Sequence, residues 1–132
     1  MAAAPEPTPF ELVGPLPVPR STTVLEASAG TGKTFALAGL VTRYIAEGAA
    51  TLDQMLLITF SRAATQELRD RVRRQIADAV AAFTTPDMAE NNELLAHLLT
   101  GSPEELAAVL AHEFQHRALF VIEVNLMVWH FL

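Results

Sequence analysis

Residues 26–34 read EASAGTGKT, and this stretch decides the expected fold. It matches the phosphate-binding loop pattern G-x-x-x-x-G-K-[S/T] at each position after the first, where Ala27 stands in place of glycine. Gly30 and Gly32 let the backbone turn so that successive N–H groups converge on an anion, and the N-terminus of a following helix adds positive potential. Lys33 is the single lysine of the chain and falls where the motif requires one. We therefore expect Lys33 to lie against phosphate oxygens and the Thr34 hydroxyl to bind Mg²⁺.

The flanks of this loop predict a βαβ unit over residues 22–83. Residues 22–26 are β-branched and apolar, which predicts a short strand. A helix is expected from Lys33 to a C-terminal cap at Gly48, with its apolar stripe at Leu37, Leu40, Val41, Tyr44 and Ile45. Residues 55–60 form a continuous apolar run, as does a strand buried on both faces. A second helix is expected over residues 63–83, with a stripe at Leu68, Val72, Ile76, Ala79, Val80 and Phe83.

The remaining segments divide the chain into three parts. Six prolines in residues 1–20 predict an extended leader, which Phe10, Leu12, Val13 and Leu16 attach to the surface of the domain. Residues 21–117 are expected to form a partial N-terminal RecA-like domain of the α/β P-loop NTPase class, with a parallel βαβ core and extra helices near 88–99 and 103–117. Residues 118–132 form an apolar tail, in which 120–126 have the character of a strand.

Two stretches together resemble a known family. The stretch VLEASAGTGKTFALAGL (residues 24–40) resembles motif I of UvrD/Rep-type superfamily 1 DNA helicases, and LLITFSRAATQELRDRVRRQI (residues 56–76) resembles their motif Ia. Within that family the loop wording and the Pro-rich leader are most similar to the beta subunits of exodeoxyribonuclease V. The resemblance implies an ATP-dependent DNA helicase of recombinational repair, with ATP and Mg²⁺ as cofactors. It implies nucleotide contacts from Ala27, Ser28, Ala29, Gly30, Thr31, Gly32, Lys33 and Thr34.

Motif Ia implies a DNA-facing surface. The resemblance implies that single-stranded or duplex DNA is contacted by Thr59, Phe60, Ser61 and Arg62. It also implies protein partners, namely the other subunits of an exodeoxyribonuclease V-like complex. An exposed aromatic can stack on a base and arginines attract phosphates. Five of the nine basic residues lie in residues 61–75, inside a chain of net charge −6. Two structural alternatives to DNA binding remain. Phe60 could be a core residue, and the arginines of Arg69–Arg74 could belong to a solvated helix face.

The chain also departs from the family pattern. Pro19-Arg20-Ser21 stands where family members carry a glutamine that reads adenine, and no Asp-Glu pair follows a buried strand. Phosphoryl transfer depends on such acidic groups and on a second RecA-like domain. The expected chain is thus a truncated N-terminal portion of a helicase, or alternatively a nucleotide-binding remnant without turnover.

A third hypothesis comes from His112-Glu113-Phe114-Gln115-His116, which spells the H-E-x-x-H zinc peptidase motif. A catalytic zinc needs a third protein ligand, and no H-x-x-G-x-x-H extension follows. We therefore expect a polar helix face there. Zero cysteines exclude disulfides and thiolate zinc sites, and the absence of a long apolar run or signal-peptide pattern predicts a cytoplasmic protein with no membrane partner.

Overall fold

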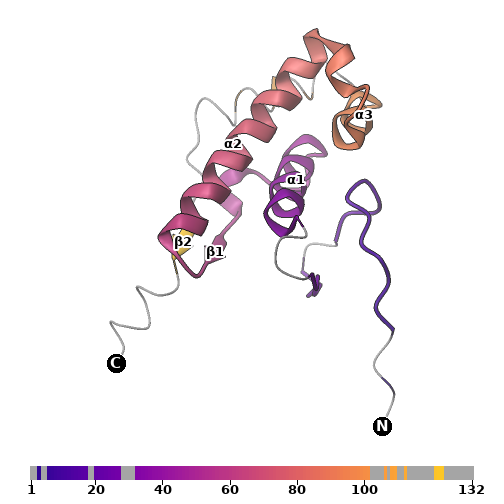
Figure 1. Ribbon diagram of the computed structural model, residues 1–132. Coiled ribbons are helices and arrows are strands. Elements are labelled where there is room, and N and C mark those ends of the chain that lie inside the picture. Colours follow the sequence, from indigo (N-terminus) through magenta and orange to yellow (C-terminus); the bar gives the residue numbers. More distant parts are fainter. Residues whose placement is uncertain are drawn as a thin grey trace.

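The computed structural model describes residues 3, 6–17, 20–27, 32–101, 106, 108–109, 112 and 121–123. The regular elements within these residues are the helices α1 (Lys33–Ala46), α2 (Arg62–Thr84) and α3 (Glu93–Leu99), the strands β1 (Leu57–Thr59) and β2 (Val121–Glu123), and the short 3-10 helices η1 (Leu52–Gln54) and η2 (Pro86–Ala89). The long helix α2 organises the fold. Helix α1 lies beside it, α3 lies near its C-terminal end, and the two strands lie at its N-terminal end (Figure 1).

The core lies where α1, α2 and α3 meet. The predicted stripe of α2 is confirmed, since Leu68, Val72, Ile76 and Ala79 are buried and Val80 and Phe83 pack against the core. Leucines of α3 and the second half of α1 complete it, with Val41, Ile45, Leu94, Leu95 and Leu98 buried.

The buried face predicted for α1 is wrong at one position, Leu37. Leu37 is exposed, whereas Ala38, Thr42 and Arg43 are buried, because α1 is covered on more than one side in its second half. The helix begins at Lys33 as predicted. It ends at Ala46, two residues before Gly48.

The helix ends follow local capping chemistry. Gly48 has φ +69, a left-handed conformation that suits glycine just after a helix, and its N–H donates to the Ile45 carbonyl at 3.1 Å. The Ser61 hydroxyl caps α2 by accepting from the Ala64 N–H. The helix expected over 88–99 starts only at Glu93, because the side chain of Asn92 caps it there and η2 occupies residues 86–89.

The two described strands pair in parallel, with Leu57 opposite Val121 and Thr59 opposite Glu123. The strand character expected for residues 120–126 is confirmed over 121–123. The strand expected over 22–26 is not formed, and Val24 is 75% exposed. A strand needs a hydrogen-bonded neighbour, and the described sheet holds only β1 and β2. The βαβ arrangement expected for residues 22–83 is therefore not confirmed.

The prediction that residues 55–60 are buried on both faces is also wrong. Leu56, Ile58 and Phe60 are 59%, 57% and 79% exposed, whereas Leu57 and Met55 pack against the core. The alternation has period two, as expected for a strand with one face covered. Helix α2 covers the inner face, and no element among the described residues covers the outer one.

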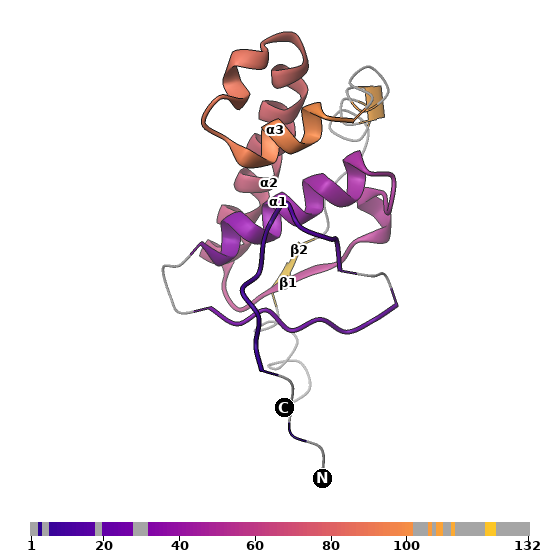
Figure 2. The same cartoon turned by 90° about the vertical axis from the view of Figure 1, so that its right-hand side faces the viewer.

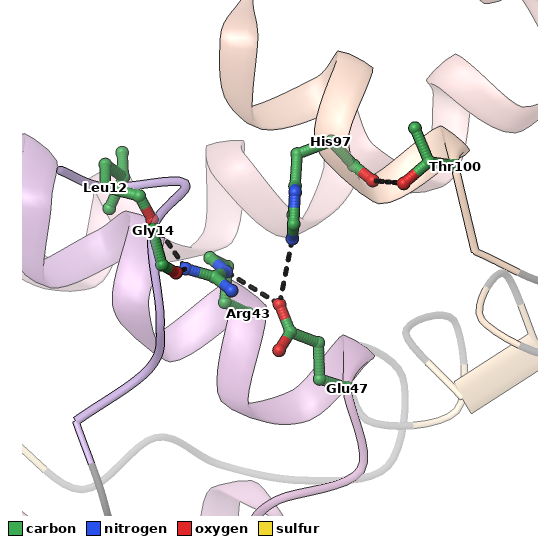
Figure 3. A network of polar contacts seen from close by, with 6 residues as sticks. All are labelled: Leu12, Gly14, Arg43, Glu47, His97 and Thr100. Atoms are coloured by element: carbon green, nitrogen blue, oxygen red, sulfur yellow. Dashed lines mark hydrogen bonds and ion pairs between the residues drawn. The ribbon is translucent and has the colours of Figure 1, made fainter.

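The leader belongs to the folded body. Figure 2 shows that it rises to α1 and turns back there, and a Cβ placed on Gly39 would lie 2.9 Å from the Leu12 side chain, so the two segments approach closely. Arg43 holds the leader from the side of α1. Its Nη1 donates to the carbonyl oxygens of Leu12 at 2.7 Å and Gly14 at 2.5 Å (Figure 3).

The helix expected over 103–117 lies mostly outside the described residues. Within this range the structure describes residues 106, 108, 109 and 112, and all four are helical. Among the residues that the structure describes, no helix combines the length and the apolar character needed to cross a bilayer.

Candidate phosphate-binding site

The N-terminus of α1 is open toward an anion. Gly32, the residue before the helix, has φ 87 and ψ 23, and its carbonyl accepts the first helical hydrogen bond from the Ala36 N–H at 2.9 Å. The N–H groups of Lys33, Thr34 and Phe35 therefore precede the intrahelical pattern. Glycine has no side chain to cap them, and the first turn holds no acidic residue. Among the described residues no side chain caps this turn, so its three N–H groups and the positive helix end suit an external acceptor.

Gly32 is required by its backbone conformation. A Cβ at this position would meet no atom within 4 Å, so space is not the reason for glycine. The positive φ is the reason, because a left-handed conformation is costly for residues with a Cβ.

The two side chains that the motif predicts to be functional, Lys33 and Thr34, lie on this first turn. Lys33 is exposed and Thr34 is half-buried. An ammonium, a hydroxyl and backbone N–H groups are the donors that bind a phosphate with its Mg²⁺. Ala27 is exposed at the other end of the loop, and the expected contacts from residues 28–31 lie outside the described residues.

The corner between β1 and α2 carries the predicted DNA-facing residues. Phe60 is exposed, so the alternative that it is a core residue is wrong. Ser61 caps α2, and Arg62 is the exposed first residue of that helix. The corner thus presents an aromatic ring, a cation and a helix N-terminus next to one another.

Thr59 lies differently from the other three residues of this corner. It alternates with Phe60 along the strand, and its Oγ1 lies 2.6 Å from Oγ1 of Thr65. The hydroxyl therefore links the end of β1 to the first turns of α2. The structure brings Phe60, Ser61 and Arg62 together at the surface and leaves the Thr59 hydroxyl on the helix side.

Sequence reasoning missed the residues that hold α1 in place. Arg43 is only 3% exposed, and its Nε donates to Oε1 of Glu47 at 2.7 Å. His97 of α3 places Nε2 3.2 Å from the same carboxylate oxygen, as Figure 3 shows. Tyr44 adds a hydrogen bond from its hydroxyl to the Pro17 carbonyl. The i, i+4 spacing of Arg43 and Glu47 was the available signal, but it gives no hint of the leader as partner.

An open hollow elsewhere in the chain does not suit a phosphate. It lies between the leader and residues 23–26, and its lining includes the carboxylates of Glu6, Glu11 and Glu26 but not Lys33. Three carboxylates repel a phosphate. The zinc hypothesis gains no support either. His112 is exposed, residues 113–116 lie outside the described residues, and no group of three potential ligands exists among those described.

Comparison with known proteins agrees with this geometry. The profile of the UvrD/REP helicase N-terminal domain matches residues 13–122. A glycine-rich loop opening a helix at lysine is what defines a P-loop NTPase, and this match implies that fold. More particularly, the chain belongs to the UvrD/REP helicase N-terminal domain family. The family expected from motifs I and Ia is confirmed.

The curated proteins that are similar to this chain include RecB subunits of several bacteria. RecBCD enzyme subunit RecB of Mycobacterium tuberculosis H37Rv is 68% identical over 98 residues, which is 74% of this chain and 9% of the relative. RecB of Mycolicibacterium smegmatis is 72% identical over 83 residues, or 63% of this chain and 8% of the relative. RecB of Escherichia coli K12 is 43% identical over 75 residues, which is 50% of this chain and 6% of the relative. The chain therefore spans less than a tenth of the length of these relatives. No solved structure gives a significant match.

Proposed function

We propose that this chain binds the phosphates of ATP at the N-terminus of α1. The observation that carries the proposal is the left-handed Gly32 followed by an uncapped first turn that begins with Lys33. The three N–H groups and the Lys33 ammonium supply positive potential from one side, which is the chemistry of a triphosphate site. The contacts assigned to residues 27–31 extend the same site.

Mg²⁺ fits the same turn. The Thr34 hydroxyl is a hard oxygen ligand beside Lys33, and Mg²⁺ in nucleotide sites is held by one or two protein oxygens together with phosphate oxygens. When bound, the ion would neutralise charge on the phosphates. The described residues offer no cluster of acidic ligands that would hold a cation without a nucleotide.

The corner at Phe60, Ser61 and Arg62 is proposed to contact single-stranded DNA. An exposed ring offers a stacking surface for a base, and the exposed Arg62 offers positive charge to a phosphate. Thr59 would support this corner through its bond to Thr65.

The activity of the longer protein is also a proposal. Relatives named RecBCD enzyme subunit RecB point to an ATP-dependent DNA helicase of recombinational repair that assembles with other subunits. Residues 21–117 would be part of its first RecA-like domain, and β1 would belong to the parallel sheet of that domain. The outer face of β1, which no described element covers, supports this, because parallel sheets are covered on both faces. Within these 132 residues no Asp-Glu pair follows a buried strand, so we expect binding without turnover from this chain alone.

The test replaces the lysine of the site. Lys33→Ala is expected to weaken binding of a fluorescent ATP analogue about ten- to a hundredfold, because hydrogen bonds to charged groups are worth roughly 1.5–3 kcal/mol. Binding is measured by fluorescence titration of the 132-residue chain in the presence of Mg²⁺.

Arg74→Ala is the matched control, since it removes one exposed cation from the far side of α2 and should leave nucleotide binding unchanged. Circular dichroism checks that both variants fold. Equal affinity of Lys33→Ala and the unmodified chain would refute the proposed phosphate site.

A further inference from the structure

The leader is attached to the second half of α1 by contacts with three residues of that helix. Arg43, which is 3% exposed, donates from Nη1 to the carbonyl oxygens of Leu12 at 2.7 Å and Gly14 at 2.5 Å. The Tyr44 hydroxyl donates to the Pro17 carbonyl at 2.5 Å. The Leu12 side chain lies against the helix where a glycine leaves room for it. We call the three helix residues the leader clamp, namely Gly39, Arg43 and Tyr44.

The chain that the leader clamp holds continues to the phosphate loop. Beyond Pro17, residues 20–27 run back along α1 toward its first turn, as Figure 2 shows. This returning segment and α1 face each other across a hollow of about 320 Å³. The hollow is lined by Ser21, Thr23 and Leu25 on one side and by Leu37, Leu40 and Tyr44 on the other. The chain that enters the phosphate loop therefore follows the helix on which the loop ends.

This segment is fixed to α1 at both of its ends. Pro17 is held at Tyr44, and fifteen residues further along the chain Gly32 leads into Lys33, the first residue of the same helix. Tyr44 and Lys33 lie about 17 Å apart along the helix, at 1.5 Å per residue. A segment fixed at both ends has fewer conformations than one fixed at a single end, because closing a loop removes conformational entropy.

The phosphate loop, residues 27–32, belongs to this closed segment. Its N–H groups act on a phosphate only when they converge on one anion. A binding site whose conformation is restricted beforehand has a higher affinity than one that the ligand must order, because less entropy is lost on binding. Fixing the backbone of one residue corresponds to about a tenfold change in affinity. The leader clamp is therefore expected to act on the affinity of the site as well as on the stability of the fold.

We propose that the leader clamp positions the phosphate loop, so that attachment of the leader and binding of a nucleotide strengthen each other. The inference rests on the proposed phosphate site and adds a regulatory contact to it. Arg43 is a positioning residue, because it lies near the other end of α1 and acts through the leader. Since the coupling of two binding equilibria is reciprocal, the nucleotide should hold the leader on α1 by the same factor by which the leader raises nucleotide affinity.

The first measurement is the affinity of the 132-residue chain for the fluorescent ATP analogue with Mg²⁺. Arg43→Met is expected to raise Kd about tenfold. Tyr44→Phe, which removes only the hydroxyl bonded to Pro17, should raise Kd about threefold, a factor typical of one neutral hydrogen bond. Asn92→Ala is the matched control, because it destabilises α3 and keeps the leader contacts, and its Kd should equal that of the unmodified chain.

The second measurement tests the reciprocal effect, which a merely structural role of Arg43 would not produce. Chymotrypsin cleavage after Phe10 reports the detached leader, because the protease needs the neighbouring residues, Leu12 among them, free of the helix. A saturating concentration of the ATP analogue with Mg²⁺ should slow this cleavage about tenfold in the unmodified chain. In Lys33→Ala the same concentration should slow it less. Mass spectrometry identifies the fragment that begins at Glu11.

The outcomes separate the leader clamp from the phosphate site. If Arg43→Met speeds cleavage but binds the nucleotide as tightly as the unmodified chain, the clamp serves stability alone and the inference is overturned. If Lys33→Ala weakens nucleotide binding while the nucleotide leaves cleavage of the unmodified chain unchanged, the phosphate site stands and the coupling is refuted. An unmodified chain that binds no nucleotide contradicts both. Should Arg43→Met fail to fold, Tyr44→Phe and the protection of the unmodified chain decide the question.

Discussion

Arg43 is the charged side chain that is buried among the described residues, and it decides where the leader lies. Its guanidinium donates to two leader carbonyls and to Glu47, so the cost of burying the charge is offset by charge-assisted hydrogen bonds. The same Glu47 carboxylate also contacts α3, because its Oε1 lies 3.2 Å from Nε2 of His97. One arginine thereby connects the leader, α1 and α3 at the end of α1 away from the phosphate site.

Arg43→Met is expected to lower the free energy of unfolding by about 1–3 kcal/mol, because it leaves the half-buried carbonyls of Leu12 and Gly14 without their donor. Urea denaturation measures this, and chymotrypsin cleavage after Phe10 should become faster as the leader detaches. Arg74→Met, at an exposed position, should change stability by less than about 0.5 kcal/mol. Equal stability of the two variants would contradict the role of Arg43.

At the scale of elements, the three helices differ in whether a side chain caps their N-terminus. Ser61 and Asn92 cap α2 and α3 with side-chain oxygens, at 3.1 Å from the N–H groups of Ala64 and Leu95. Gly32 before α1 offers no such oxygen. A capped N-terminus stabilises its helix, whereas the uncapped one keeps its donors for a ligand. The contrast within one chain supports α1 as the binding helix.

Asn92→Ala is expected to lower the free energy of unfolding by about 1 kcal/mol, because the N-terminus of α3 loses the oxygen that caps Leu95. Thermal and urea unfolding both report the change. Asn91→Ala is the matched control, since this neighbouring asparagine is exposed and lies outside the cap. If the two substitutions cost the same, the cap at Asn92 is not the cause of the late start of α3.

At the scale of the whole molecule, the described elements cover the sheet on one side only. Helix α2 lies over β1 and β2, while Leu56, Ile58 and Phe60 form an exposed apolar row on the outer face of β1. Residues 22–26, which form no strand, carry further exposed apolar side chains, Val24 and Leu25. An apolar row of this kind attracts apolar molecules from solution.

Ile58→Ser is therefore expected to reduce fluorescence of the dye ANS in the presence of the folded chain, with little change in stability, because Ile58 is 57% exposed. Leu57→Ser, one residue earlier on the strand, should instead lower the free energy of unfolding by about 1–3 kcal/mol, since Leu57 packs against the core. If both variants destabilise equally, the outer face of β1 is not free in solution.

Much of the local structure could be predicted from the sequence. The start of α1 at Lys33, the stripe and the limits of α2, and the strand character near residue 121 follow from periodicity and capping, which are properties of neighbouring residues. The strand at 22–26, the two-sided burial of residues 55–60 and the burial of Leu37 were wrong. Each of those depends on whether another element covers the segment, and periodicity does not report that.

The sequence alone determined the proposal of a phosphate loop with Lys33, because a motif of this kind is contained in consecutive residues. The basic charge near motif Ia was likewise visible in the order of residues. Only the tertiary structure decided that Phe60 is exposed, that Thr59 faces Thr65, and that Arg43 is buried against the leader 29 and 31 residues away. Burial and long-range pairing are set by which surfaces meet in space, and that depends on the packing of whole elements rather than on spacing along the chain.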